Sequence, residues 1–183
     1  AGIFEIGPHA PDMMETRAER ALQTMFDGTS FVTFWVKELA TCLDPSATGY
    51  IQCFPSDELL MATRMNAAGQ ILSETVVLDI TAETGVAYRP FEFNAISHPF
   101  GFTIAWLKVG GSGREVYYGN LNSSFVVQNK GHFSVPQGQE VRLAGNGSTT
   151  ALMWSEASGY NALWRFATLS SSGVLGAPVA VST

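Results

Sequence analysis

Aromatic side chains are the residues of this chain whose chemistry is best suited to ligand binding. The apolar C–H faces of sugars stack on aromatic rings, and turns rich in Asn, Ser and Gly supply hydrogen bonds around them. Exposed aromatic rings also form contacts between protein subunits. The candidate ligand-binding residues are Tyr117, Tyr118, Tyr160 and Trp164. Their type predicts a contact either with a glycan or with another subunit.

Catalytic and metal-binding chemistry is much less well represented. Gly110–Gly113 reads GGSG, which is a hairpin turn and lacks the G-x-S-x-G pattern of a nucleophilic serine. The histidines His9, His98 and His132 are isolated, and none has the partner four residues away that a helical metal site requires. The motifs of calcium loops and phosphate-binding glycine loops are absent. The sequence predicts no metal, no cofactor and no catalytic residue, and it favours a protein that is not an enzyme.

The two cysteines, Cys42 and Cys53, flank a segment between two predicted strands. If these strands pair, the ends of the segment are close enough for a disulfide bond. Such a bond would stabilise the fold by about 3 kcal/mol and would indicate an oxidising compartment. Two free thiols are the equally supported alternative. Two cysteines are too few to make a zinc site by themselves.

The elements that position these residues follow a pattern that occurs three times. It is clearest in Thr149–Val181, where an apolar strand runs to a tryptophan, a polar turn follows, and two more strands are separated by SSSG. The first strand of this pattern, Thr150–Trp154, is matched by Phe31–Trp35 and Phe102–Trp106. Similarity at this level predicts repeat units that bury their faces against each other. The three tryptophans should then be buried at equivalent strand ends.

The match continues beyond the tryptophans. In the second and third copies, 15 residues separate the tryptophan from a leucine, Leu121 or Leu169, that precedes a small polar turn. In the first copy, Ala62–Gly69 reads ATRMNAAG over the corresponding strand and turn. With these features the units resemble the blade repeats of secreted bacterial β-propellers. A propeller has typically about 4–8 blades of four strands, so this resemblance implies three blades of a larger assembly, or units packed as an ordinary two-sheet fold.

The predicted fold is mainly β, with repeat-built antiparallel sheets that are propeller-blade-like or form a β-sandwich, and one N-terminal α-helix. The helix is predicted over Pro11–Phe26, because acidic residues begin it, apolar residues recur at helical spacing and Gly28 follows it. Residues 1–28 are predicted to form an N-terminal arm and this helix. Residues 29–183 are predicted to form the β-repeat domain, with units at about 29–80, 100–128 and 140–183.

The charge of the chain limits its partners. The net charge is −6, and the 10 Lys and Arg residues are spread singly, so no basic cluster is available to bind nucleic acid. No apolar run approaches the roughly 20 residues that span a bilayer. Only 14% of the residues are charged, and Gly, Ser and Thr are plentiful, as in secreted β proteins and packed assembly subunits.

These observations favour a non-enzymatic structural or binding module of an extracellular or virion-type assembly. Its expected partners are copies of itself, other subunits or a glycan. Strand edges left unpaired at the ends of the repeat array, and the apolar arm Ala1–Ala10, favour an oligomer. The alternative function is a subunit or fragment of a propeller-type hydrolase.

Overall fold

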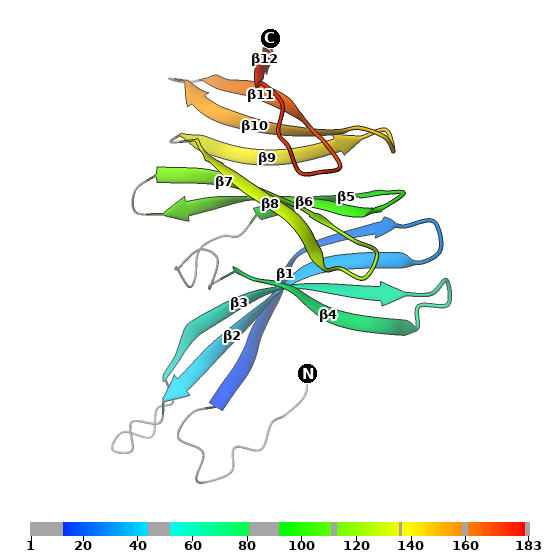
Figure 1. Ribbon diagram of the computed structural model, residues 1–183. Helices are drawn as coiled ribbons and strands as arrows, with labels where there is room; N and C mark the ends of the chain where they lie inside the picture. The colour runs from blue at the N-terminus through cyan, green and yellow to red at the C-terminus, as the bar shows by residue number, and fades with distance from the viewer. Residues whose placement is uncertain are drawn as a thin grey trace.

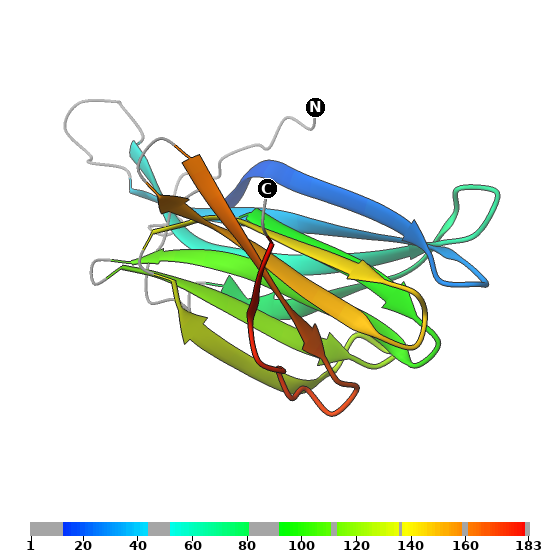
Figure 2. The same ribbon diagram turned by 90° about the horizontal axis from the view of Figure 1, so that it is seen from above.

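The computed structural model describes residues 13–43, 52–80, 92–110, 113–135, 137–158 and 161–181. All regular elements in these ranges are β-strands, and they form three four-stranded antiparallel sheets. Sheet 2 lies between sheets 1 and 3, so that the three sheets stack in the order of the sequence (Figures 1 and 2). The prediction of a mainly β fold built from antiparallel sheets is confirmed.

Each sheet is a meander in which strands that follow each other in sequence pair with each other. Sheet 1 consists of β1 (Met13–Phe26), β2 (Phe31–Leu43), β3 (Gln52–Met65) and β4 (Ile71–Asp79). Sheet 2 consists of β5 (Glu92–His98), β6 (Gly101–Gly110), β7 (Gly113–Leu121) and β8 (Val127–Ser134). Sheet 3 consists of β9 (Gly138–Gly145), β10 (Thr150–Ser158), β11 (Asn161–Leu169) and β12 (Val179–Val181).

The three tryptophans of the repeat occupy the second strand of each sheet. Trp35, Trp106 and Trp154 are 8%, 2% and 2% exposed, which confirms their predicted burial at equivalent positions. They lie within their strands rather than at strand ends, because β2, β6 and β10 all continue beyond them. Equivalent residues of the three sheets can therefore be identified by their position relative to these tryptophans and by strand register.

The helix predicted over Pro11–Phe26 is wrong for all of its described residues. Met13–Phe26 is strand β1 and pairs with β2 from its first residue to its last, while residues 11 and 12 lie outside the described ranges. Apolar residues four positions apart suit one face of a strand as well as a helix, because four is a multiple of the strand period of two. Pairing with β2 outweighs helix propensity, which is a weak preference.

Two apolar layers hold the stack together. In the first, Val32, Phe34 and Val36 of β2 pack against residues of sheet 2 that include Phe102 and Trp106. The second layer lies between sheets 2 and 3 and contains Ala105, Leu107, Val116, Tyr118, Leu143, Leu152 and Trp154. Successive residues of β6 thus enter different layers, as the alternation of a strand requires. Sheet 2 is covered on both faces.

The register of β2 and β3 bears on the predicted disulfide. Cys42 is the cross-strand partner of Cys53, so the strand pairing that the prediction requires is present. The Cα atoms of such partners are about 4.5–5.5 Å apart, within the range of about 4.4–6.8 Å that a disulfide spans. The side chains of both residues lie outside the described part of the structure, and the bond stays a prediction.

Candidate functional site

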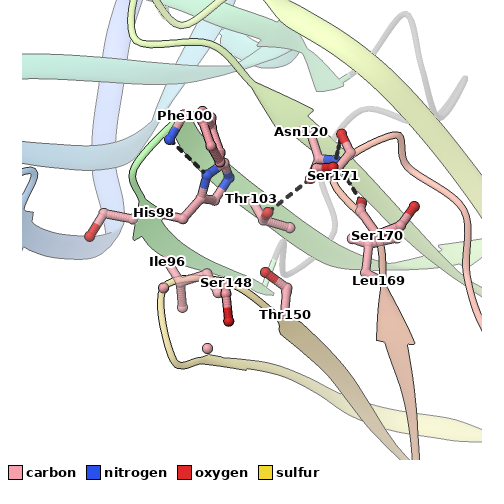
Figure 3. Close-up of a pocket in the computed structure, with 13 residues that line it drawn as sticks. Ile96, His98, Phe100, Thr103, Asn120, Ser148, Thr150, Leu169, Ser170 and Ser171 are labelled. Carbon is pink, nitrogen blue, oxygen red and sulfur yellow. Dashed lines mark hydrogen bonds between the residues drawn. The ribbon is translucent and has the colours of Figure 1, made fainter.

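A polar cleft lies between sheets 2 and 3, at the edge of these sheets where three turns meet (Figure 3). One wall comes from β5, β6, β7 and the β5–β6 turn, and the other from the end of β9, the β9–β10 turn, β10, β11 and the turn after β11. The lining residues are Ile96, Ser97, His98, Phe100, Thr103, Asn120, Gly145, Gly147, Ser148, Thr150, Leu169, Ser170 and Ser171. The lining contains hydroxyl groups, one amide and two rings, and it includes no Asp, Glu, Lys or Arg.

The turns between the first and second strands of sheets 1 and 3 share one pattern of hydrogen bonds. In sheet 1 the Asp27 carboxylate accepts hydrogen bonds from the N–H groups of Thr29 and Ser30, at 2.9 and 2.8 Å. In sheet 3 the side-chain oxygen of Asn146 accepts from the N–H groups of Ser148 and Thr149, at 3.1 and 2.9 Å. These turns read DGTS and NGST, and their second residue, glycine, has a positive φ in both.

The first turn of sheet 2 departs from this design, and it lies in the wall of the cleft. His98 stands where the other sheets have Asp27 or Asn146, and Phe100 stands where they have Thr29 or Ser148. The side chain of Phe100 is left in contact with solvent, since the residue is 76% exposed. Breaks in a repeated local rule tend to occur at functional sites. This turn is therefore the strongest candidate for a ligand contact.

His98 and Phe100 form one unit in this turn. The Phe100 N–H donates a hydrogen bond to His98 Nδ1 at 3.3 Å, and the two ring centroids are 6.5 Å apart. In the neutral imidazole, an accepting Nδ1 places the proton on Nε2. The cleft thus combines an exposed aromatic face with a nitrogen donor beside it.

Asn120 shapes the floor of the cleft. Its Oδ1 accepts a hydrogen bond from Thr103 Oγ1 at 2.8 Å, and its Nδ2 donates to the carbonyl oxygens of Ser170 and Ser171 at 3.2 and 3.1 Å. These bonds join sheet 2 to the turn that follows β11, as Figure 3 shows. A buried amide whose donor and acceptor are both used in this way holds the two walls at a fixed spacing.

The hydrogen bonds to Asp27 can be tested through the dependence of stability on pH. Burial raises the pKa of Asp27, but hydrogen bonds from the N–H and O–H groups of Thr29 and Ser30 outweigh it and lower the pKa from 3.8 to about 2. A carboxylate with a lower pKa in the folded state stabilises it fully above pH 3.8, and this contribution is lost as the pH falls towards 2. Asp27→Asn keeps the acceptor that Asn146 uses in sheet 3 but cannot titrate.

We therefore expect the urea midpoint of Asp27→Asn to fall less steeply than that of the unmodified protein when the pH is lowered from about 5 to 2. The variant also leaves Arg64 without the carboxylate that lies 3.1 Å from it, so its midpoint at neutral pH should be slightly lower. Asp57→Asn, which changes a carboxylate outside this turn, is the matched control. Parallel pH profiles for Asp27→Asn and the unmodified protein would contradict this account of the turn.

The aromatic residues singled out in the sequence lie away from the cleft. Tyr117 of β7 stacks between Trp106 and His132, with centroid distances of 5.4 and 5.0 Å. Its neighbour Tyr118 points to the opposite face and is buried in the layer between sheets 2 and 3. Trp164 lies on β11 and is partly exposed. Tyr160 lies outside the described residues, and the structure does not bring Tyr117, Tyr118 and Trp164 together.

Sequence reasoning treated His98 only as an isolated histidine and did not select Phe100, although a signal for both was available. Aligning the turns DGTS, HPFG and NGST of the three repeats shows where the middle copy departs from the other two.

Metal and membrane features add no further site. Within the described ranges, no three His, Cys, Asp or Glu side chains are grouped so that they could hold a metal ion. The part of the chain that the structure describes contains no helix with the length and apolar character to cross a membrane. No protein-family model, curated protein or solved structure matches the chain.

Proposed function

We propose that the chain is a non-catalytic binding module of an extracellular or virion-type assembly, built from blade repeats of the β-propeller type. Its ligand is an uncharged saccharide, bound in the cleft between sheets 2 and 3. The observation that carries this proposal is the β5–β6 turn, where His98 and Phe100 replace the polar turn residues of the other two sheets.

The chemistry of the lining supports a saccharide over other ligand classes. The exposed Phe100 ring suits the C–H face of a sugar, and His98 Nε2 suits a hydroxyl oxygen as a donor. Hydroxyl groups of Ser148, Thr150 and Ser171 line the same space. A phosphate or carboxylate ligand would call for a cationic side chain, and the lining includes no Lys or Arg.

The hydrolase alternative has less support from this cleft. Glycoside hydrolysis generally uses two carboxylates across the scissile bond, and the lining residues include neither Asp nor Glu. His98 Nδ1 already accepts a hydrogen bond from the Phe100 N–H. A base for a serine nucleophile would therefore have to be Nε2 in the other tautomer. Binding without turnover is the simpler use of these groups.

The experiment is a glycan array followed by titration calorimetry with the best neutral saccharide. Phe100→Ser introduces the residue that sheet 3 has at this position, and we expect it to weaken binding about tenfold, because a stacked aromatic contact is lost. His98→Asn restores the amide found in sheet 3 and should weaken binding by a similar factor. Val126→Ser removes another exposed apolar side chain outside the cleft and should leave the affinity unchanged.

Three results would refute the proposal. The first is an array on which no neutral glycan binds. The second is an affinity that Phe100→Ser and His98→Asn leave unchanged, because the ligand would then occupy another surface. The third is release of reducing sugar from the bound glycan, which would favour the hydrolase.

A further inference from the structure

Two kinds of hydrogen-bonded link between neighbouring sheets occur more than once in the structure. The first kind joins the first strand of one sheet to the first strand of the next. Gln23 of β1 makes two hydrogen bonds to the backbone of Ala95 in β5, with Nε2 donating at 2.7 Å and Oε1 accepting at 2.8 Å. Asn94 of β5 accepts from the backbone N–H of Leu143 in β9 at 2.7 Å. In each case an amide side chain on one first strand binds the backbone of the next first strand.

These amides occupy equivalent positions, and a third equivalent exists. Gln23, Asn94 and Arg142 are each the cross-strand partner of the residue that precedes the repeat tryptophan. Arg142 is the member in sheet 3, where no following sheet is present in the described structure. Its side chain is 49% exposed and lies 3.0 Å from Glu140. A following first strand would offer Arg142 a backbone carbonyl at the position of Ala95, whose carbonyl oxygen accepts from Gln23.

The second kind of link joins the third strand of one sheet to the turn after the third strand of the next. Arg64 of β3 donates to the carbonyl oxygen of Ser123, in the turn after β7, at 2.9 Å. Asn120 of β7 donates to the carbonyl oxygen of Ser171, in the turn after β11, at 3.1 Å. The register makes Thr168 of β11 the third member of this series, and Thr168 is exposed. The third member of both links is thus on the outer face of sheet 3.

The apolar positions follow the same rule. Phe34 of sheet 1 and Ala105 of sheet 2 point to the following sheet and are fully buried. Their equivalent in sheet 3, Met153, lies on the outer face, because Leu152 and Trp154 on either side of it face sheet 2. Met153 is partly exposed, as are Phe166, which is its partner on β11, and Trp164, two residues away.

The outer face of sheet 1 carries the complementary half. Sheets 2 and 3 present their repeat tryptophan to the preceding sheet, and in sheet 1 this face has no preceding sheet among the described residues. Trp35 and its partner Met61 on this face are already buried within one chain, at 8% and 5% exposed. The part that stays exposed includes Phe31, the equivalent of buried Phe102, which is 41% exposed and packs on exposed Phe26 with a centroid distance of 5.4 Å. Val76, the partner of Met61, is also exposed on it.

We infer that a second copy of this chain covers the exposed parts of both faces, with the outer face of sheet 3 in each copy packed on the outer face of sheet 1 in the other. The occupant follows from the continuity of the interface: these two faces are the halves that already meet twice within the chain. Two copies give six sheets, which lies within the range of about 4–8 that closes a propeller ring. The contact is head-to-tail and closes at two. This inference is independent of the saccharide cleft.

The first measurement is the mass of the unmodified protein in solution. Light scattering at about 20 µM, where an interface of standard size is normally occupied, should give twice the 19.7 kDa of one chain. A monomer would overturn the inference, because the faces would then be uncovered or covered by something other than a second copy. A trimer or an open series of larger species would overturn closure at two.

Two variants then test the head-to-tail arrangement. Met153→Asp places a charge on the outer face of sheet 3, and Phe31→Asp places one on the outer face of sheet 1. Each should weaken dimerisation at least about 30-fold, as expected at a central apolar contact. Met153→Leu and Phe31→Leu are the matched controls and should remain dimeric. Because Arg142 is half exposed, Arg142→Asp replaces Met153→Asp if that variant does not fold, as judged by circular dichroism.

Mixing the two charged variants gives the decisive result. A copy with Met153→Asp keeps a normal sheet 1 face, and a copy with Phe31→Asp keeps a normal sheet 3 face. The mixture should therefore recover one intact interface and form a mixed dimer that neither variant forms alone. Two outcomes would contradict the head-to-tail contact: a dimer that only one of the two substitutions disrupts, and a mixture that stays monomeric.

Discussion

Gly101→Ala should lower the free energy of unfolding by about 3–5 kcal/mol, measured by urea denaturation. Gly101 has a φ of 136°, which favours glycine, and it begins β6 directly after the β5–β6 turn. A Cβ at this position would collide with the carbonyl oxygen of Leu121 and would lie 2.8 Å from the carbonyl carbon of Asn122. Both obstacles are backbone atoms of the neighbouring chain segment, so no side-chain movement can relieve the collision.

Gly28→Ala separates this collision from simple backbone strain. Gly28 also has a positive φ, of 101°, and lies in the first turn of sheet 1, but a Cβ there would meet no atom within 4 Å. It should therefore cost only about 1–2 kcal/mol. Equal losses in the two variants would show that the close approach of Gly101 to Leu121 is not a tight constraint in solution.

The same approach explains why the β5–β6 turn can differ from its counterparts. In sheets 1 and 3 the position of Gly101 is held by Ser30 and Thr149, which donate their N–H groups to the Asp27 and Asn146 side chains three residues earlier. His98 makes a hydrogen bond only to the Phe100 N–H among these turn residues. The turn is instead fixed by its contact with the backbone around Leu121, which leaves the Phe100 side chain exposed.

The repeat was the part of the fold that sequence reasoning could identify. Buried tryptophans and the residues around them recur because each sheet must fill the same apolar layer. The first strands were harder to find. Met13–Phe26 has little resemblance to Glu92–His98 or Gly138–Gly145, although β1 and β5 are both joined to the next sheet by an amide side chain. An amphipathic helix fits the apolar spacing of Met13–Phe26 equally well, and only the pairing with β2 distinguishes the two.

The candidate site was not found in the sequence for a related reason. The exposed aromatic residue of the cleft, Phe100, comes from a four-residue turn, whereas the aromatic residues selected from the sequence lie on strands. Tyr118 is buried because its strand position faces sheet 3, and Tyr117 is covered by Trp106 and His132. Burial of this kind depends on which face of a strand meets a neighbouring sheet. Sequence alternation gives the two faces but not the partner of each.

The layer between sheets 1 and 2 depends on Phe34. This residue is fully buried, and its ring lies edge-on to Phe102 and Phe125, with centroid distances of 5.4 and 5.9 Å. The equivalent residue in sheet 2 is only alanine, Ala105, because its partner on β7 is the large Tyr118. Phe34 instead has the small Ala62 as its partner on β3. Each layer is thus filled by one large residue from this pair of positions.

Phe34→Ala leaves alanine at both positions of this pair, 34 and 62, where one large residue is needed. The substitution should lower the free energy of unfolding by about 3–5 kcal/mol in urea denaturation, although sheet 2 also has alanine at the position of Phe34. Phe34→Met, which introduces the residue of sheet 3, keeps most of the volume and should cost below about 1.5 kcal/mol.

Sheet 2 can accommodate Tyr118 because Gly131 is its partner on β8, and a Cβ at Gly131 would collide with the tyrosine hydroxyl. Sheet 1 has Thr75 at that place, so Ala62→Tyr should fail to rescue Phe34→Ala unless Thr75→Gly is added. Rescue by Ala62→Tyr alone would show that the layer repacks freely and that the pairing of large with small residues does not constrain it.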